Sequence, residues 1–502
     1  MIAAFAQIVL GARRHSTAIL QFLLKMSRWM RRNRRVPTGQ ELRRGMHRLK
    51  HMIRISANHP SLAVPRGFIL PKKMEPYQAW LAVNHFTEKH GSCLRTRLEA
   101  AGSTLPRISV IMPVYNSNPK FLDDAIRSVV NQVYGNWELC IVDDASTGDE
   151  VRNTLSRWQG GDARIRITRR ESNGNISIAT NDAARLATGD FLAFLDHDDL
   201  LTPDAIGEVA LASATNPDTD LFYSDDDKID QHGNRFAPQF KPDWSRELLL
   251  SYMYVSHLVV VRRSLFECLG GMRAGFEGSQ DYDFVLRAYE RAHNVIHLPY
   301  ILYHWRAVPG STATSGNAKP LSFEAGRRAV EDSLARRGVH VPVVQADWAL
   351  AEGLGIFRPV FKDAGPSVTV IIPTKNQWRI LDRCLQSLKK TTYANWTVLV
   401  VDNNSDDDEC IRYLNSLECK VTCISNPGPS FSFAYVNNRA AEQVDTDYVL
   451  FLNNDTEVIS PDWLSMMIGY AQIDGVNRES GRRPPASKLL HLGAGRGSSG
   501  VG

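Results

Sequence analysis

The sequence predicts an α/β protein built on a mostly parallel sheet, present as one full copy and one incomplete copy. Near-continuous apolar runs such as SVIMP (109–113) and WELCIV (137–142) alternate with helical stretches such as FLDDAIRSVVNQ (121–132). Such runs are typical of parallel strands that helices cover on both faces. In addition, the same succession of strands and helices returns after residue 366.

Three segments of the first copy recur at matched intervals. RISVIMPVYN (107–116) matches PSVTVIIPTKN (366–376), YGNWELCIVDDAS (134–146) matches YANWTVLVVDNNS (393–405), and GDFLAFLDHDDLLTPD (189–204) matches TDYVLFLNNDTEVISPD (446–462). Pro113 and Asp143 are 30 residues apart, and Pro373 and Asp402 are 29 apart. This regularity indicates a tandem duplication of a domain rather than a short solenoid repeat.

Polar and acidic side chains follow the strands of the first copy. Asn116, Asp143–Asp144 and Asp196–Asp199 all stand where an apolar strand ends. Ligands of such sheets bind beyond the carboxyl ends of the strands, so we expect these side chains to converge on one site. Asp143 and Asp144 are suited to accept hydrogen bonds from a pyrimidine ring or from ribose hydroxyls. The alternative for this pair is a helix cap formed with Ser146.

Asp196 and Asp198 are two residues apart, so on an extended backbone both carboxylates point to one side. They would form a hard, oxygen-rich site suited to Mg²⁺ or Mn²⁺, and the cation would offset their mutual repulsion. The alternative is that these acids, Asp199 in particular, cap the helix expected after Pro203.

Taken together, SVIMPVYN, QVYGNWELCIVDDAS and NGNISIATNDAARLATGDFLAFLDHDD resemble family 2 glycosyltransferases with the GT-A fold. The resemblance covers about 107–310 and resumes at 366–465. It implies an inverting transfer of a sugar from a nucleotide-diphosphate donor, with Asp198 as the primary metal ligand of a DxD-type motif. The implied nucleotide-sugar contacts are Pro113, Tyr115, Asn116, Asp143, Asp144, Asn173 and Asp196.

An inverting transfer also needs a general base, which the family places in an ED-type motif. GGMRAGFEGSQDYDFVLRAYE (270–290) matches this motif, with Gln280–Asp281 in place of Glu–Asp. The resemblance therefore implies Asp281 as the base. The alternative for Asp281 and Asp283 is charge stabilisation of a helix N-terminus.

Three further stretches resemble a bacterial subgroup that assembles O-antigen and other surface polysaccharides, often as tandem-domain, rhamnosyltransferase-like enzymes. They are YSDDDKID (223–230), FKPDW (240–244) and LYHWRAVPGSTA (302–313). This resemblance implies a growing, lipid-linked glycan as acceptor. His304 and Arg306 are weaker candidates to reach the metal or the diphosphate, since a His in an aromatic stretch is more often structural.

The second copy keeps Asp402 and Asp455 but has Asn403 and Asn453 where the first copy has Asp144 and Asp196. Asp402 and Asp455 are therefore only weak candidates for a second donor site. The interval from Asp198 to Asp281 is 83 residues, whereas 47 residues follow Asp455. We therefore expect a half-domain without an acceptor site or a base, followed by a disordered Gly-, Ser- and Arg-rich tail.

Charge is concentrated at the start of the chain. Residues 1–60 hold 13 Lys and Arg and one acid, Glu41, although the whole chain has a net charge of only +5. Amphipathic basic segments of this kind suit an anionic membrane surface, and the alternative is a solvated tail. No recognition motif for nucleic acid accompanies the basic residues, so we expect no nucleic-acid partner.

The seven cysteines show no metal-ligand spacing, which favours reduced thiols. We expect a cytoplasmic protein, peripheral on the inner membrane. The predicted organisation is 1–60 basic helical segment, 61–106 helical lead-in, 107–322 first GT-A domain, 323–365 connector, 366–474 incomplete second domain and 475–502 disordered tail.

Two other functions compete with a transferase. The first is a catalytically degenerate sugar- or nucleotide-binding subunit of a polysaccharide assembly complex, suggested by the incomplete second copy. The second is a phosphatase with a DxD nucleophile, suggested by FLDHDDLLT. That motif normally opens its domain, whereas here it lies about 90 residues into it, and the second copy replaces the would-be nucleophile by Asn453.

Overall fold

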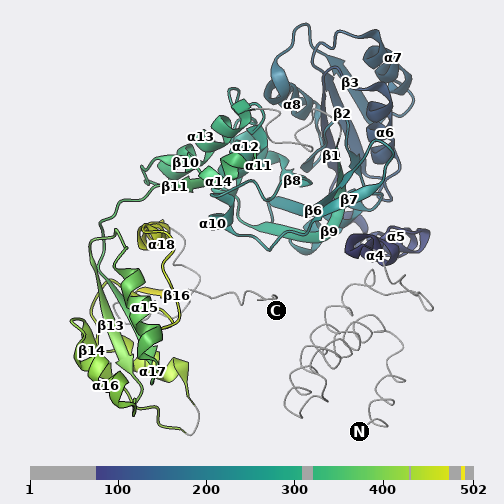
Figure 1. Ribbon diagram of the computed structural model, residues 1–502. Helices are drawn as coiled ribbons and strands as arrows, with labels where there is room; N and C mark the ends of the chain where they lie inside the picture. The colour runs from purple at the N-terminus through teal and green to yellow at the C-terminus, as the bar shows by residue number, and fades with distance from the viewer. Residues whose placement is uncertain (1–74, 308–319, 429–430, 474–487, 492–502) are drawn as a thin grey trace, which may run out of the picture. The chain divides into compact units, whose positions relative to one another are not determined.

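The structure, a computed structural model of the 502-residue chain, describes residues 75–307, 320–428, 431–473 and 488–491 (Figure 1). It divides into two compact units, of which the first runs to Ala325 without Leu250–Tyr252, and the second holds those three residues and the remainder. The predicted segment 1–60 and most of the predicted tail lie outside the described residues.

The first unit contains a nine-stranded sheet and the helices that cover it. Its elements are α4 (Pro76–Asn84), α5 (Glu88–Ala101), the 3-10 helix η2 (Gly102–Thr104), β1 (Ile108–Val114), α6 (Pro119–Val130), β2 (Trp137–Asp143), α7 (Asp149–Trp158), β3 (Ile165–Arg169), α8 (Asn175–Leu186), β4 (Phe191–Phe194), β5 (Leu200–Leu201), α9 (Ala205–Thr215), β6 (Leu221–Ile229), β7 (Arg235–Gln239), α10 (Arg246–Leu249), β8 (Val259–Arg262), α11 (Arg263–Cys268), α12 (Gln280–Tyr289) and β9 (Val295–Arg306).

The sheet confirms the predicted α/β class. Its order is β3-β2-β1-β4-β8-β6-β9-β5, with β7 beside β6, and the β1–β4 part is entirely parallel. Every residue of β1 and β2 is buried, because α6 and α7 lie along one face of these strands and α8 along the other (Figure 1). Apolar side chains therefore project from both faces of these strands. Strand β8 runs antiparallel to β4 and to β6, a reversal that strand patterning did not predict.

Helix α6 shows how the sequence directs the chain away from the end of β1. The Asn118 side chain accepts hydrogen bonds from the backbone N–H groups of Lys120 and Phe121, and Pro119 occupies the first turn. Both features favour a helix start at this point, two residues before the predicted helix. The helix then buries Leu122, Ile126 and Val129 against β1 and β2.

A fully buried carboxylate, Glu138, ties β2 to its neighbours. It accepts hydrogen bonds from the Ser109 hydroxyl at 2.7 Å and from the Thr188 backbone at 2.6 Å, and Arg107 lies 3.3 Å from it. Burial by itself raises the pKa of Glu138, but these hydrogen bonds and the Arg107 charge leave that pKa below its ordinary value. Its ionised form is thus held by the fold.

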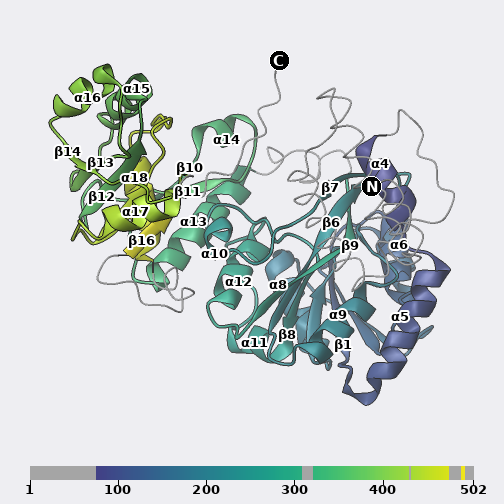
Figure 2. The same ribbon diagram turned by 90° about the horizontal axis from the view of Figure 1, so that it is seen from below.

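Helices α4 and α5 precede β1, and Figure 2 shows α5 beside α9. Arg97 of α5 pairs with Glu208 of α9 at 2.6 Å, and Leu94 packs so closely that a Cβ at Gly207 would lie 2.9 Å from it.

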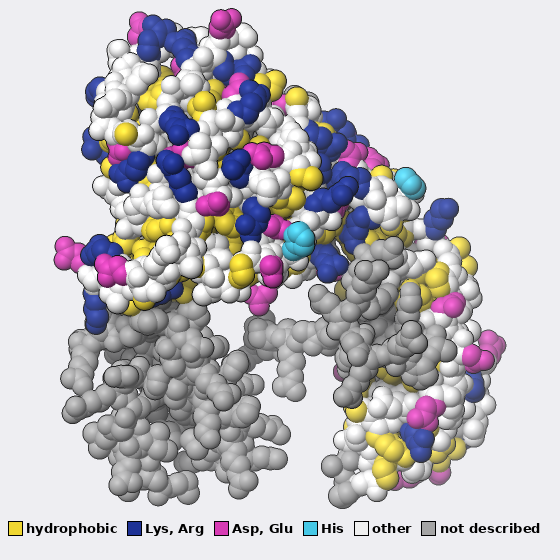
Figure 3. Space-filling view, turned by 180° about the vertical axis from the view of Figure 1, so that it is seen from behind, with side chains coloured by type: hydrophobic (Ala, Val, Ile, Leu, Met, Phe, Trp, Pro, Cys, Tyr) yellow, Lys and Arg dark blue, Asp and Glu magenta, His cyan; other side chains and the backbone are white. Residues whose placement is uncertain are grey.

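On the face drawn in Figure 3, Lys and Arg side chains of the described residues are spread among Asp and Glu. No described helix is long and apolar enough to cross a membrane.

The second unit is smaller and carries a five-stranded sheet. Helix α13 (Pro320–Arg336) leads into it, and its elements are β10 (Val343–Gln345), α14 (Asp347–Ala351), β11 (Phe357–Pro359), β12 (Val368–Thr374), α15 (Trp378–Leu388), β13 (Trp396–Asp402), α16 (Asp408–Asn415), β14 (Lys420–Cys423), α17 (Phe433–Ala441), β15 (Tyr448–Phe451), α18 (Trp463–Gln472) and β16 (Lys488–His491).

The order β14-β13-β12-β15 in the second unit repeats the order β3-β2-β1-β4 in the first. The register repeats as well, since Asp402 pairs with Thr374 as Asp143 pairs with Val114. Beside β15 the pattern differs: β16 is parallel to it, whereas β8 is antiparallel to β4. Among the described residues of the second unit, no helix follows β16 as α12 follows β8.

Candidate active site

The turns after β1 and β2 are joined through Asn116 and Asp143. The Asn116 backbone N–H donates to the Ser146 hydroxyl at 2.9 Å, and the Ser146 N–H donates to the Asp143 carboxylate at 2.9 Å. Asn116 has a φ of 47°, which Asn tolerates better than most residues. The structure thus brings these two predicted residues together. The alternative of a helix cap does not hold, because α7 has Gly148 at its N-cap position and no side-chain cap bond. Pro113 lies within buried β1, and Tyr115 is 44 % exposed.

Asp144 is buried and points toward the turn that begins α8. Its carboxylate accepts a hydrogen bond from the Gly174 N–H at 2.8 Å and pairs with Arg170 at 2.8 Å. The Asn173 side chain donates to the Asp144 backbone carbonyl at 3.3 Å. Arg170 also pairs with Asp182, so one guanidinium holds two carboxylates. The structure therefore places the predicted Asp144 and Asn173 in one network.

Asp199 is only 1 % exposed and fixes the β4–β5 turn. It accepts hydrogen bonds from the Tyr303 hydroxyl at 2.6 Å and from the Arg306 backbone at 2.7 Å. Arg306 also donates to the Asp198 carbonyl at 2.6 Å. Burial, together with the charges of Asp198 and Asp196, raises the pKa of Asp199 well above its ordinary value. The alternative role as a helix cap does not hold for Asp199.

The helix after this turn, α9, begins at Ala205, and Asp204 occupies its N-cap position without a side-chain cap bond. Asp199 does not reach this N-terminus, because β9 returns beside β5 and supplies Tyr303 and Arg306 as its donors. A partner about 100 residues further along the chain thus replaces the local cap.

Asp281 lies in the first turn of α12, near enough to His257, which precedes β8, for their charges to interact. Burial raises the pKa of Asp281, although the nearby His257 opposes this, and burial lowers the pKa of His257. Both residues are half-buried. Asp283 differs: it is fully buried and held by Arg273 and by Arg287, the latter at 2.9 Å. These ion pairs, rather than a helix N-terminus, account for the position of Asp283.

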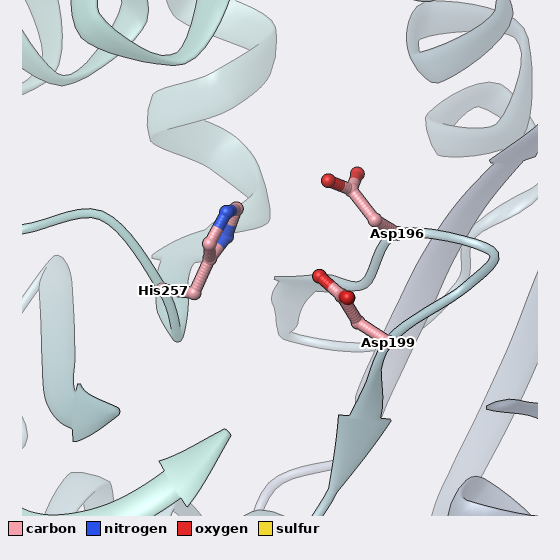
Figure 4. Close-up of side chains that lie close together, drawn as sticks. All are labelled: Asp196, Asp199 and His257. Atoms are coloured by element: carbon pink, nitrogen blue, oxygen red, sulfur yellow. The ribbon is translucent and has the colours of Figure 1, made fainter. Parts of the chain in front are cut away.

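One group of side chains has the composition of a cation site. Ligand atoms of Asp196, Asp199 and His257 all lie within 4.8 Å of one another. Figure 4 shows the imidazole of His257 turned toward the two carboxylates, which come from the opposite loop. Two carboxylates and one imidazole fit a divalent ion. Asp198, the predicted primary ligand, is two residues from Asp196 but is not a member of this group.

The three acids of SDDDK in β6 are buried and paired. Asp225 pairs with His297 at 2.8 Å, Asp226 pairs with Lys241 at 2.7 Å, and Asp227 pairs with His304 and with Arg235, the latter at 2.6 Å. The Nδ1 of His304 is thus bonded to Asp227, which favours a structural role for this weaker metal candidate.

Sequence reasoning missed His257, Lys241 and Tyr303. His257 stands in YVSHLVVV (254–261), where nothing but its residue type distinguishes it from the start of an apolar strand. Lys241 and Tyr303 lie in FKPDW and LYHWR, which were singled out only as stretches resembling a subgroup. Their roles depend on contacts between distant segments, which no local pattern encodes.

The second unit repeats the strand-end turns with less charge. Asp402 accepts hydrogen bonds from Ser405, whose hydroxyl accepts one from the Asn376 N–H at 3.0 Å. Asn403 accepts one from the Asn426 N–H at 3.1 Å, as Asp144 does from Gly174. Cys423, at the end of β14, lies opposite Asp402, whereas Arg169, at the end of β3, lies opposite Asp143 in the first unit. Asp455 is exposed.

Residues 109–270 and 369–488, more than half of the chain, match the model of the family described as Glycosyl transferase family 2. The chain belongs to this family. The resemblance to family 2 glycosyltransferases is therefore confirmed. Both matched segments carry the parallel strands described above.

Two curated relatives match over 405 residues. An uncharacterized protein, y4gI, of Sinorhizobium fredii is 41 % identical, and the match covers 79 % of this chain and 44 % of the relative. The O-antigen biosynthesis protein RfbC of Myxococcus xanthus is 36 % identical, with coverage of 80 % and 31 %. The chain thus spans less than half the length of either relative. Among solved structures, S. aureus TarS 1-349 in complex with UDP-GlcNAc aligns with a TM-score of 0.37 at 19 % identity, covering 45 % of this chain and 66 % of that one.

Proposed function

We propose that the first unit transfers a sugar, with inversion, from a nucleotide-diphosphate donor to a growing surface glycan. The observation that supports this most is the position of Asp281. Although Asp281 and Asp196 are 85 residues apart in the chain, their carboxylates lie near enough for the charge of Asp196 to raise the pKa of Asp281. A candidate base thus stands beside the acids at the end of β4, where a donor would bind.

The donor nucleotide would lie over the ends of β1 and β2. The exposed ring of Tyr115 offers a face for stacking a base, and Asn116, Asp143 and Asp144 surround the turns next to it. Arg170, which pairs with the Asp144 carboxylate, would orient it toward a ribose hydroxyl or a ring N–H. Asn173 and Pro113 would shape the same region from α8 and β1.

Asp198 and Asp196 would hold Mg²⁺ or Mn²⁺. When bound, such an ion supplies Lewis acidity and stabilises the charge that develops on the leaving diphosphate. Asp281 would take the proton from the acceptor hydroxyl as that oxygen attacks the sugar carbon, and its raised pKa makes it a stronger base than an exposed carboxylate. Direct attack on the face opposite the diphosphate gives inversion.

The acceptor is proposed to be a lipid-linked glycan at the cytoplasmic face of the inner membrane. Support comes from the relative named for O-antigen biosynthesis and from the basic composition of residues 1–60, which lie outside the described residues. Binding of the full chain to anionic vesicles, compared with a chain lacking residues 1–60, tests the membrane part. Equal binding of the two would contradict it.

The transfer itself is tested with UDP-, dTDP- and GDP-sugars, Mn²⁺ and a glycolipid extract, by measuring nucleoside diphosphate release. Asp281→Asn should lose transfer and retain donor binding. Asp149→Asn is a matched control, because Asp149 also lies in the first turn of a helix, where a carboxylate contributes roughly 0.3–1 kcal/mol. Undiminished turnover by Asp281→Asn would refute the assignment. Donor binding without turnover by the unmodified chain would favour the degenerate-subunit alternative.

A further inference from the structure

His257 differs from His297 and His304, two other half-buried histidines of the first unit. His297 bonds to Asp225 at 2.8 Å, and His304 bonds to Asp227, so each has a carboxylate partner that accounts for its place. Among the described residues, the ring nitrogens of His257 have no hydrogen bond, and the structure records only stacking and longer-range charge interactions for the ring. The ring nitrogens of His257 are therefore available to bind a ligand.

The orientation of the His257 ring is fixed from two sides. The ring stacks on Tyr303, with centroids 4.5 Å apart and planes 13° apart, and meets Trp305 edge-on at 5.6 Å. Lys241, which is buried, donates from Nζ to the carbonyls of His257 and Val255. Both the ring and its backbone are thus held before any ligand arrives, which lowers the entropic cost of binding.

Tyr303 also orients Asp199. The ring that stacks on His257 carries the hydroxyl that donates to the Asp199 carboxylate at 2.6 Å. A single side chain therefore positions an imidazole and a carboxylate toward the same point, as residues behind metal ligands commonly do. Each carboxylate oxygen has two lone pairs, so Asp199 keeps acceptor capacity beyond its two hydrogen bonds.

We propose that His257 is a nitrogen ligand of the divalent-cation site, where it and Asp199 join the proposed ligands Asp196 and Asp198. This rests on the proposed function, because the occupant is the cation of the nucleotide-sugar donor. The ligand atoms of Asp196, Asp199 and His257 lie within 4.8 Å of one another, and two ligands on opposite sides of one ion with bonds of about 2.1 Å stand roughly 4.2 Å apart. Small side-chain rotations would close the site.

An imidazole ligand changes which metal the site prefers. Carboxylates and water suit Mg²⁺, whereas imidazole favours transition metals. We therefore expect the chain to bind Mn²⁺ more tightly than Mg²⁺, and His257→Gln to reduce this preference. A site formed by Asp196 and Asp198 alone would show no such dependence on position 257.

The test is pulsed electron paramagnetic resonance of Mn²⁺ bound to the full chain, with and without UDP, dTDP and GDP. We expect the unmodified chain to show the ¹⁴N modulation of a coordinated imidazole and His257→Gln to lose it. The Mn²⁺ affinity of His257→Gln should fall at least about tenfold, since replacing residues that only orient a metal ligand already lowers metal affinity or activity roughly 10–100-fold. His304→Gln should retain the signal. His257→Asn provides a second variant if His257→Gln does not fold.

A folded, Mn²⁺-loaded chain without imidazole coupling would overturn this inference and leave the proposed transfer intact. Coupling that survives in both His257 variants, or is lost in His304→Gln, would also overturn it. Conversely, the chain could show coupling that depends on His257 and yet release no nucleoside diphosphate from any donor. That result would support His257 as a metal ligand and contradict the proposed transfer. Absence of Mn²⁺ binding under every condition would overturn the cation site as a whole.

Discussion

Replacing Lys241 by Met should destabilise the first unit strongly. The side chain of Lys241 is 3 % exposed and that of Asp226 is not exposed at all, with Nζ and the carboxylate 2.7 Å apart. Removing one member of a buried ion pair costs about 3–5 kcal/mol, because the other charge stays buried without compensation. The ammonium also donates to the carbonyls of Ser224, Val255 and His257, and these acceptors would lose their donor as well.

Part of this cost is relieved if Asp226 takes up a proton, since burial already raises the pKa of Asp226. We therefore expect a loss of about 3 kcal/mol rather than the sum of all lost contacts. Urea unfolding followed by circular dichroism measures this loss in the free energy of unfolding. Lys228→Met, the same substitution on strand β6, is the control. The double variant Asp226→Asn/Lys241→Met should be more stable than the sum of the single losses predicts. A loss below about 1 kcal/mol, the value of an exposed pair, would refute this reasoning.

Three further predictions concern the first and the second unit. Because the pKa of Glu138 is lowered in the folded chain, its ionised carboxylate stabilises the fold at pH values above the ordinary pKa of 4.5, and this stabilisation is lost as pH falls below that value. Glu138→Gln should therefore make the urea midpoint depend less steeply on pH in the acid range. Arg170→Gln should weaken nucleotide binding in calorimetry, whereas Arg152→Gln, in an exposed pair with Asp149, should not; equal effects would contradict the Asp144 network. Asp402→Asn should leave nucleoside diphosphate release unchanged, and a loss of turnover would assign catalysis to the second unit as well.

The sequence predicts the parallel half of the fold because each strand there is a continuous apolar run with its own turn. It predicts little of the β6–β9 region, where pairing joins segments such as Leu221–Ile229 and Val295–Arg306. Likewise, acids at strand ends are visible as local motifs, whereas His257 faces Asp196 across 61 residues of sequence. Asp199 shows the same limit: its proximity to Pro203 suggests a helix cap, and Tyr303 supplies the actual partner.

The most direct test of the account is equilibrium binding of UDP, dTDP and GDP, with and without Mn²⁺, to the intact chain and to Asp198→Asn. We expect that one nucleotide binds in a Mn²⁺-dependent manner and that Asp198→Asn loses this dependence. Failure of every nucleotide to bind a folded chain would contradict a donor site in the first unit and favour the degenerate-subunit alternative.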